Sequence, residues 1–292
     1  NSAENSNNTS SGESDDQKTD QKTEEAEQDT YKIGISVSST SDEFCATMIE
    51  GIEAAKKESG DKIEVFLVSA EHASDQQLNQ IDTWIAQGMD AAIIQPVDTH
   101  AISAGISLLN EAGIPVVCMN NKTDSGDYTF VGSSSLDSGK IQGEWVAENA
   151  PENATYCYLQ VPMGTTAQLE RKQGLEEVLK EERTDIEVLS EQCGNAARDE
   201  GLKLTEDWIQ AYGHFDMLIS QNDAMALGAK EALSTAGITD TLICGIDGNR
   251  EAMEAIQEGT YGATLLQNGY KQGYYSTMMA YWELTKDPQF TG

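Results

Sequence analysis

Short apolar runs alternate with helical patterns from Tyr31 to the end of the chain. Each run has the length of a buried strand, whereas the segments between them repeat apolar residues at the spacing of one helix face. Short connections, several of them containing glycine, join each strand to the next helix. This alternation is typical of β-α units, whose strands pair in parallel and whose helices cover both faces of the sheet. The sequence therefore predicts an α/β fold.

The β-α units fall into two similar blocks, and two separate α/β lobes fit them better than one continuous sheet. In the first block we expect strands at 32–38, 63–68, 91–95 and 115–119, and helices at 44–58, 75–87 and 99–111. In the second block we expect strands at 155–161, 186–190, 215–219, 242–246 and 263–266, with helices at 138–148 and 166–182, around Leu204, Leu227 and Met253, and at 270–284.

Residues 1–30 differ from the rest of the chain. Asn, Ser, Thr, Gln, Glu and Asp dominate this segment, and the first aromatic residue of the chain is Tyr31. Such a composition cannot bury enough apolar surface to offset the entropy lost on ordering, so we expect a disordered acidic tether. A tether that holds a domain off a surface and an inert tail both fit this composition.

The charge and the residue content exclude several classes of function. A formal net charge of −32 disfavours nucleic acid and anionic membrane surfaces as partners. No apolar run approaches the roughly 20 residues that a membrane-spanning helix needs. The five cysteines include no C-x-x-C pair, and His72, His100 and His214 lie far apart in the sequence. We therefore expect no metal site and no cofactor.

One stretch illustrates how a β-α unit could form a binding site. Residues 215–219 have the pattern of a buried strand, and the next helix is expected to begin at Asp223, a suitable capping residue. Gln221, Asn222 and Asp223 then lie at the carboxyl edge of a parallel sheet, where ligands bind. Because Asn and Asp are also common in turns and caps, the local pattern by itself favours a structural role.

Polar side chains follow several other strands, and together they suit a ligand with many hydroxyl groups. Carboxylates and amides pair with hydroxyls, a guanidinium supplies a planar set of donors, and an aromatic ring covers the apolar face of a sugar. Convergence of such side chains from both blocks makes a binding role competitive with a structural one. The candidates are Ser38, Asp42, Phe44, Asn120, Asn121, Arg171, Asn222, Asp247 and Gln267.

Seven short sequence motifs, taken in their order and spacing, indicate a resemblance to a known protein family. They are S-x-x-x-D-x-F at 38–44, Q-x-D-x-W-I-A-Q-G-M-D-A-A-I-I-Q-P at 80–96, G-I-P-V-V at 113–117, G-K-I-Q-G at 139–143, G-T-T-A-Q-L-E-R at 164–171, Q-N-D-A-M-A-L-G-A at 221–229 and G-I-D-G at 245–248. With them, the chain from about Lys32 to Lys286 resembles the periplasmic sugar-binding proteins of ABC transporters, in the ribose- and galactose-binding group.

The resemblance implies the periplasmic-binding-protein fold, in which two Rossmann-like lobes with parallel sheets are joined by a hinge and enclose the ligand. Residues 31–133 and 265–292 would form the N-terminal lobe and residues 134–264 the C-terminal lobe. The family normally has a further crossover at the carboxyl end, so either the sequence is truncated at Gly292 or the hinge has fewer strands. Lactose-repressor-type regulators share this fold. No helix-turn-helix pattern precedes Tyr31, so DNA binding is disfavoured.

The resemblance also implies ligand-binding roles for residues that match the family motifs, whereas Ser38 and Ser133 match the family positions more loosely. The matching residues are Asp42, Phe44, Asn120, Arg171, Asn222, Asp247 and Gln267. Asp42 with Asn120 is a galactose-like pattern, whereas Gln267 is ribose-like, so the two patterns do not name one sugar.

Two departures from the family pattern bear on the ligand. Family members usually stack a second aromatic ring on the opposite face of the sugar, and Ala196 occupies that place here. Ala167 stands where galactose binders carry an Asp. Each aromatic pair contributes about 0.5–1.5 kcal/mol. A smaller or non-pyranose polyol, a furanose or a nucleoside is therefore open as the ligand.

As a whole, the resemblance implies a solute-binding protein that captures a small neutral monosaccharide or polyol outside the membrane and presents it to an ABC permease. We expect a monomer in the periplasm or at the extracellular face, anchored through a lipid on a Cys that would precede Asn1. A sensory protein that docks to a receptor kinase is an alternative. An enzyme could pair Asp42 with Asp247 as acid and base, but the sequence shows no activated nucleophile.

Overall fold

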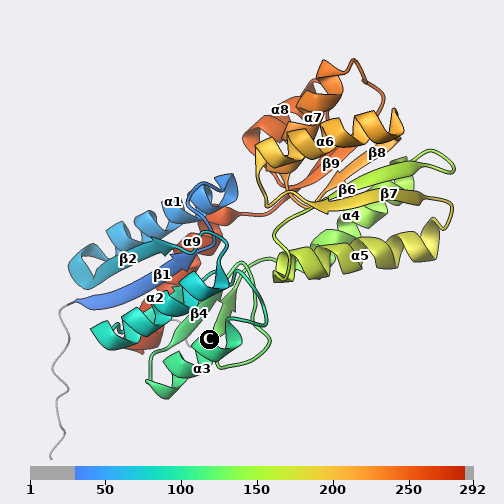
Figure 1. Ribbon diagram of the computed structural model, residues 1–292. Coiled ribbons are helices and arrows are strands. Elements are labelled where there is room, and N and C mark those ends of the chain that lie inside the picture. The colour runs from blue at the N-terminus through green and yellow to red at the C-terminus, as the bar shows by residue number, and fades with distance from the viewer. Residues whose placement is uncertain (1–29, 287–292) are drawn as a thin grey trace, which may run out of the picture.

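The computed structural model describes residues 30–286. The expected tether up to residue 29 lies outside the described residues, as does the segment 287–292. Two lobes of similar architecture make up the described chain, and each contains a five-stranded parallel sheet (Figure 1). The predicted α/β fold with two lobes is confirmed.

The N-terminal lobe is built on a sheet with the strand order β2-β1-β3-β4-β5. Its strands are β1 (Tyr31–Val37), β2 (Ile63–Ser69), β3 (Ala91–Ile94), β4 (Val116–Met119) and β5 (Thr129–Val131). Its helices are α1 (Glu43–Glu58), α2 (Ser74–Gln87), α3 (Ser103–Glu111) and α9 (Gly269–Thr285), with a short 3-10 helix at Gly60–Lys62.

The two faces of this sheet are covered by different helices. Ile33 and Ile35 of β1 point to one face, where they form a core with Met48 of α1 and Ala280 of α9. The opposite face packs on α2 and α3. Gly34 belongs to that second face, and a Cβ atom there would lie 2.6 Å from the ring of Trp84. The alternation along β1 therefore places α2 directly against the sheet.

The C-terminal lobe repeats this plan with the strand order β10-β9-β8-β6-β7. Its strands are β6 (Thr155–Gln160), β7 (Glu187–Cys193), β8 (Met217–Ser220), β9 (Leu242–Asp247) and β10 (Ala263–Leu266). Its helices are α4 (Ser135–Asn149), α5 (Thr166–Glu182), α6 (Arg198–Tyr212), α7 (Asp223–Thr235) and α8 (Arg250–Gln257). Residues of α4 and α5 cover one face, and residues of α6, α7 and α8 cover the other.

Both sheets have the same topology when the strands are counted within each lobe. In each lobe the first strand lies between the second and the third, so the chain moves outward in opposite directions from a switch point. The switch points lie between β1 and β3 and between β6 and β8. Ligands of open α/β sheets bind outside the carboxyl ends of the strands at such points.

The chain crosses between the lobes twice within residues 30–286, once between β5 and α4 and once between β10 and α9. The expected lobe boundary after residue 264 falls inside β10. Because Ala263 to Leu266 pair with β9 of the C-terminal lobe, the second crossing follows Leu266.

The other differences from the expected elements lie mainly at helix and strand ends. The helix expected from residue 99 begins only at Ser103, because the Asp98 carboxylate accepts hydrogen bonds from the backbone nitrogens of His100 and Ala101 and holds a turn there. The three-residue strand β5 was not expected, since a run so short carries no periodicity.

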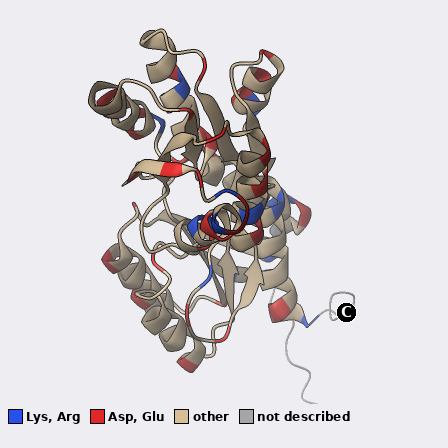
Figure 2. Cartoon of the chain, turned by 90° about the vertical axis from the view of Figure 1, so that its right-hand side faces the viewer, with Lys and Arg blue, Asp and Glu red and all other residues tan. Residues whose placement is uncertain are grey.

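Acidic residues are distributed over the helices of both lobes (Figure 2). None of the helices described in this structure is long and apolar enough to cross a membrane. All five cysteines are free thiols.

Candidate functional site

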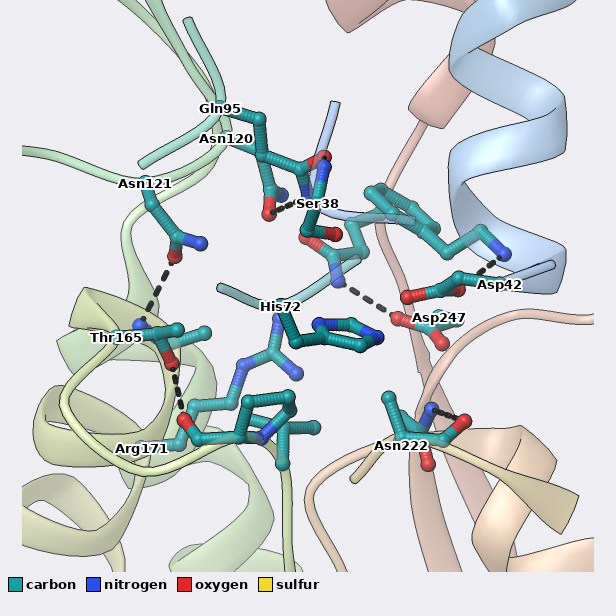
Figure 3. Close-up of a pocket in the computed structure, with 16 residues that line it drawn as sticks. Ser38, Asp42, His72, Gln95, Asn120, Asn121, Thr165, Arg171, Asn222 and Asp247 are labelled. Carbon is teal, nitrogen blue, oxygen red and sulfur yellow. Dashed lines mark hydrogen bonds between the residues drawn. The ribbon is translucent and has the colours of Figure 1, made fainter. Parts of the chain in front are cut away.

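A cavity lies between the lobes, at the carboxyl ends of both sheets (Figure 3). It contains about 460 Å³ of atom-free space, counting the part that opens to solvent. Residues from both lobes line it: Ser38, Asp42, Phe44, His72, Gln95, Asn120, Asn121, Val161, Pro162, Thr165, Ala167, Arg171, Ala196, Asn222, Asp247 and Gln267.

A chain of amide hydrogen bonds orients the side chains at the N-terminal lobe. The backbone nitrogen of Ser38 donates to Gln95 Oε1 at 2.8 Å, and Gln95 Nε2 donates to Asn120 Oδ1 at 3.4 Å. Asn120 Nδ2 in turn donates to Gln272 Oε1 of α9 at 3.0 Å. These bonds assign the donor and acceptor ends of both amides, so their positions toward the cavity are determined by the lobe itself.

Asp42 caps the first helix of the chain and also lines the cavity. Its Oδ1 atom accepts a hydrogen bond from the backbone nitrogen of Phe44 at 2.9 Å, which places the carboxylate at the start of α1. Burial raises the pKa of the Asp42 carboxyl above its ordinary value, although the bonds from the helix backbone act in the opposite direction. A ligand hydroxyl that donates to this partly buried carboxylate would offset part of its desolvation.

Phe44 is the only aromatic ring other than the His72 imidazole among the residues that line the cavity. Its side chain is buried, with 8% exposed. Ala196 also lines the cavity, from the connection between β7 and α6. The apolar face of a sugar ring could therefore stack on Phe44 with no second phenyl or indole ring in this lining.

Close packing of α4 on α5 places Arg171 at the cavity. A Cβ atom on Gly139 would lie 2.2 Å from the backbone oxygen of Arg171, and one on Gly174 would lie 2.4 Å from that of Leu136. The two helices therefore approach until their backbones touch. In Figure 3 the Arg171 guanidinium points into the cavity.

Arg171 is buried and only partly hydrogen-bonded. Its Nη1 atom donates to the backbone oxygen of Gln221, while the buried Nε has no hydrogen-bond partner among the described residues. Desolvation lowers the pKa of the guanidinium, and the nearby Asp247 carboxylate opposes this shift. A buried donor without a partner is costly, so Arg171 favours an acceptor such as a ligand oxygen.

Asp247 and Gln267, which follow β9 and β10, form a hydrogen-bonded pair in the lining of the cavity. Gln267 Nε2 donates to Asp247 Oδ1 at 2.7 Å, and both side chains are buried. Desolvation raises the pKa of the Asp247 carboxyl well above its usual range, and the charge of Arg171 only partly offsets this. Asp247 also has a φ of 138°, a conformation that L residues rarely adopt and that occurs most often at binding and catalytic sites.

The start of α7 differs from the prediction. Asn222, not Asp223, caps the helix, because its Oδ1 atom accepts from the backbone nitrogen of Met225 at 3.0 Å. Asp223 points away from the cap and accepts hydrogen bonds from Asn249, Tyr261 and Thr264. Gln221 is also occupied internally, since its side chain bonds Val161, Tyr158 and Gln168. Of these three polar residues, only Asn222 lines the cavity.

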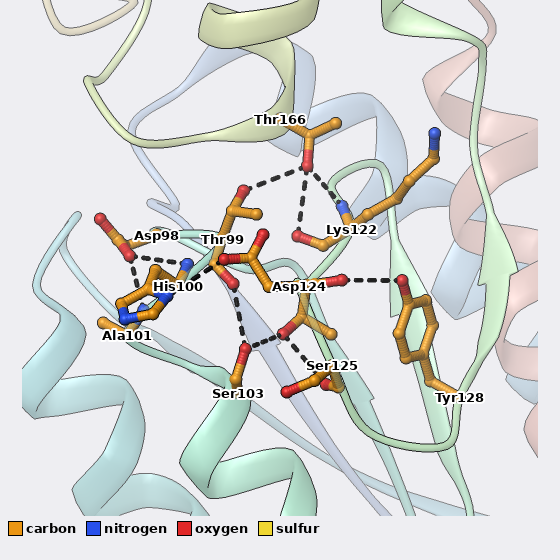
Figure 4. Close-up of polar contacts among 11 residues, drawn as sticks. Asp98, Thr99, His100, Ala101, Ser103, Lys122, Asp124, Ser125, Tyr128 and Thr166 are labelled. Atoms are coloured by element: carbon orange, nitrogen blue, oxygen red, sulfur yellow. Dashed lines mark hydrogen bonds and ion pairs between the residues drawn. The ribbon is translucent and has the colours of Figure 1, made fainter.

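Direct hydrogen bonds join the two lobes beside the cavity (Figure 4). The backbone nitrogen of Lys122 donates to Thr166 Oγ1 at 2.8 Å, and the backbone nitrogen of Thr99 donates to the Gly164 oxygen at 2.8 Å. Asn121 Oδ1 accepts from the backbone nitrogen of Ala167 at 3.2 Å. The lobes are thus in contact, as a ligand enclosed between them would require.

Nine of the ten predicted site residues line this cavity, and Ser133 does not. Its hydroxyl accepts a hydrogen bond from Gln272 Nε2 at 3.3 Å, so Ser133 lies behind Asn120 in the same network. The prediction missed five lining residues: His72, Gln95, Val161, Pro162 and Thr165. Gln95 and Val161 directly follow β3 and β6, so the strand-end rule could have found both. His72 comes from a surface loop after β2, and no local signal marks it.

Within residues 30–286, no group of three or more His, Cys, Asp or Glu side chains is placed to hold a metal ion. Most of the residues that line the cavity carry hydrogen-bond donors or acceptors in their side chains.

Comparison with known proteins matches nearly the whole described chain. The family described as periplasmic binding protein domain matches residues 33–287. The ribose import binding protein of Bacillus subtilis (strain 168) is 31% identical over 251 residues, which cover 86% of this chain and 80% of that protein. The xylitol-binding protein of Mycolicibacterium smegmatis is 32% identical over 246 residues, which cover 84% of this chain and 69% of that protein.

A solved structure of an ABC transporter solute binding protein from Bacillus halodurans, with bound myo-inositol, superimposes with a TM-score of 0.82. Its sequence is 31% identical, and the match covers 90% of this chain and 92% of that chain.

Proposed function

Because the chain belongs to the periplasmic binding protein domain family, which matches residues 33–287, we propose that it binds a small neutral sugar or polyol between its lobes and delivers it to an ABC permease. The observation that carries this proposal is the convergence of hydrogen-bonding side chains from both sheets on one cavity. The relatives named above are a ribose import binding protein, a xylitol-binding protein and a solute binding protein with bound myo-inositol.

The lining supplies the groups that such a ligand needs. Asp42 and Asp247 would accept hydrogen bonds from hydroxyls, and Arg171 would donate to ring or hydroxyl oxygens. Asn120 and Asn222 supply both donors and acceptors. Every paired hydroxyl offsets its own desolvation, whereas an unpaired one would cost about 1–3 kcal/mol. The site therefore favours a ligand whose hydroxyls match these positions, and Phe44 would cover its apolar face.

The ligand class is narrowed by the absence of a second phenyl or indole ring from the lining of the cavity. Ala196 and Ala167 contribute only methyl groups to the cavity. A flat pyranose would stack on one side only, so a cyclitol, a furanose or an open polyol suits the lining at least as well.

Binding would couple to closure of the lobes. The two crossings, between β5 and α4 and between β10 and α9, form the hinge in this proposal. A ligand that bonds side chains of both lobes stabilises the closed arrangement relative to an open one. The protein would act outside the cytoplasmic membrane, as a monomer held at the surface by a lipid anchor.

We propose binding rather than catalysis as the role of the two carboxylates. Asp42 and Asp247 are the pair that a sugar-cleaving enzyme would use, but Asp42 is bonded to the α1 backbone and Asp247 to Gln267. A binding protein leaves its ligand unchanged. Incubation of the protein with the sugar that it binds, followed by chromatography, should return the sugar intact.

The test of the proposed function is a thermal-shift screen with ribose, xylitol, myo-inositol, arabinose and allose, followed by calorimetry. A ligand that binds only the folded state raises the melting temperature, and at a hundred times its Kd it adds about 2.7 kcal/mol to the free energy of unfolding. The liganded protein should also stimulate ATP hydrolysis by a reconstituted ABC permease. Absence of any shift across the panel would contradict the proposal, and binding without permease stimulation would favour the receptor-kinase alternative.

A further inference from the structure

Gln272 lies outside the lining of the cavity, yet it hydrogen-bonds both a lining residue and the chain that crosses between the lobes. Its Oε1 atom accepts from Asn120 Nδ2 at 3.0 Å, and its Nε2 atom donates to Ser133 Oγ at 3.3 Å. The side chain is buried, with 5% exposed, so bulk water does not compete for these bonds. An amide held at both ends in this way has one orientation.

The position of Gln272 in the fold relates it to both crossings between the lobes. It lies in the first turn of α9, directly after the crossing from β10, and its backbone nitrogen donates to the Asn268 oxygen at 3.1 Å. Ser133 lies in the other crossing, between the end of β5 at Val131 and the start of α4 at Ser135. The Gln272 side chain therefore joins the two segments that would turn if the lobes opened.

The base of the Gln272 side chain is fixed to the N-terminal lobe. A Cβ atom on Gly273, the next residue of α9, would lie 1.9 Å from the backbone oxygen of Met48 in α1. The two helices therefore touch along their backbones, and the start of α9 stays with the lobe. A rearrangement of the first crossing would act on the bond to Ser133 and not on the position of α9.

Asn120 is tied to the first crossing through its backbone as well as its side chain. Its backbone nitrogen donates at 2.9 Å to the oxygen of Val131, which lies two residues before Ser133. Asn120 also has a φ of 66°, in the left-handed region. Its side chain is held by Gln95 and Gln272, so the direction of its amide depends on these two partners.

The side-chain bonds from the cavity to the first crossing all run in one direction, and we call this series the amide relay. Each amide accepts from the cavity side and donates toward the crossing, so that every bond polarises the next. One N–H of Asn120 and one lone pair of its oxygen remain for a ligand. The members, in order from the first donor, are the Ser38 backbone nitrogen, Gln95, Asn120, Gln272 and Ser133.

From these contacts we propose that Gln272 is a positioning residue that couples the hinge to the orientation of Asn120 in the cavity. With the lobes closed, Ser133 holds the Gln272 amide, which in turn directs the free N–H of Asn120 at a ligand oxygen. Opening would change the first crossing, break the bond to Ser133 and leave both amides free to turn. Ligand binding by Asn120 and closure of the lobes therefore favour each other. This inference rests on the proposed function, because it concerns how the same site is organised.

Substitutions outside the cavity test the amide relay by calorimetry, with the compound that gives the largest thermal shift in the screen described above. Ser133→Ala should weaken binding about twofold to fivefold. Gln272→Met keeps the length of the side chain, removes both bonds and should weaken binding about fivefold to twentyfold. The double variant should bind like Gln272→Met alone, since the relay is already broken there.

Two further variants serve as controls. Ser133→Thr keeps a hydroxyl at the end of the relay and should bind like the unsubstituted protein. Ser107→Ala removes an exposed hydroxyl of α3 that donates to the Ser103 oxygen at 3.0 Å, far in the sequence from every member of the relay, and should also leave binding unchanged.

Nuclear magnetic resonance of the liganded protein separates positioning from a general effect on stability. The side-chain amide signal of Asn120 is identified by its absence from Asn120→Gly, because glycine tolerates a φ of 66°. This signal should shift in Ser133→Ala, although Gln272 lies between the two residues, and it should stay in place in Ser107→Ala.

The outcomes are distinct. If Ser133→Ala leaves either the affinity or the Asn120 signal unchanged, or if Ser133→Ala and Gln272→Met weaken binding independently of each other, the amide relay is overturned and the proposed function stands. If no compound of the screen binds to the unsubstituted protein, the proposed function fails and the relay fails with it.

Discussion

Asp42 and Asn222 each combine a role in a helix with a position in the cavity. Asp42 caps α1 through a bond from Phe44, and Asn222 caps α7 through a bond from Met225. The cap uses one polar atom of each side chain and holds the rest in a single orientation. A site residue held in this way needs no ordering when the ligand arrives, so the capping role supports the binding role.

The Asp42→Asn substitution separates charge from capping. Asn caps helices about as well as Asp, so the variant should keep the contribution of the cap to stability. Its affinity for the ligand should fall about tenfold or more, because a charged acceptor for a ligand hydroxyl is lost. Calorimetry measures the affinity. Asp42→Ala is the companion variant and should lose about 1 kcal/mol of stability in addition, through loss of the cap. Unchanged affinity in both variants would remove Asp42 from the site.

The raised pKa of Asp42 also predicts how stability depends on pH in the absence of ligand. A carboxyl whose pKa is raised in the folded state favours folding when it is protonated. That contribution is present below the ordinary pKa of Asp and is lost as the pH rises through the folded pKa. Since Asn cannot ionise, the melting temperature of Asp42→Asn relative to the unsubstituted protein should be higher at pH 7 than at pH 4. An opposite trend in thermal melts would show that the carboxylate is stabilised where it lies.

At the scale of the elements, the sequence predicts most helices and strands because their patterns are long. The helix expected at 166–182 has those bounds in the structure, where Thr165 caps it. The three residues of β5 carry too little pattern, and the late start of α3 depends on the turn at Asp98. The carboxyl-end rule places side chains that follow strands in the cavity. It does not single out His72, which lies in the loop after β2 and is held beside Ser38 by a backbone hydrogen bond within the N-terminal lobe.

Helix packing, rather than the local sequence, positions Arg171. The Gly139→Ala substitution would add a Cβ atom 2.2 Å from the Arg171 backbone oxygen and force α4 and α5 apart. We expect a loss of about 1–3 kcal/mol in stability, as for other overpacked contacts, together with weaker ligand binding because Arg171 moves. Denaturant unfolding and calorimetry measure the two effects.

Gly88→Ala is the control for Gly139→Ala. Gly88 ends α2 in the left-handed conformation, with a φ of 65° and open space around its Cβ position. An alanine there should cost about 1–2 kcal/mol of stability through its backbone alone. Affinity for the ligand should not change, because Gly88 is not part of the lining. Equal losses of affinity in the two variants would mean that general destabilisation, and not the position of Arg171, is responsible.

The sequence predicts the arrangement of the two lobes only in outline. Two blocks with the same topology predict two lobes, but no local pattern states which loops meet across the cleft. The contacts of Thr99, Lys122 and Thr166 are of this kind, because they form where loops of the two lobes meet (Figure 4). They join residues that are 44 and 67 positions apart in the sequence, and none of the three residues lines the cavity. They contribute to closure without touching the ligand.

The Thr166→Val substitution tests this closure. It preserves the shape of the side chain and removes the acceptor of the Lys122 backbone nitrogen, together with the hydrogen bonds to Thr99 and to the Lys122 oxygen. A hydrogen bond of this kind contributes about 0.5–1.5 kcal/mol, so the closed state should become less stable and ligand affinity should fall about twofold to tenfold. Small-angle scattering should show a more expanded unliganded protein. Thr83→Val removes only a bond to Asn79 within α2 and should change neither quantity. If Thr166→Val leaves both affinity and scattering unchanged, these interlobe bonds do not contribute to closure.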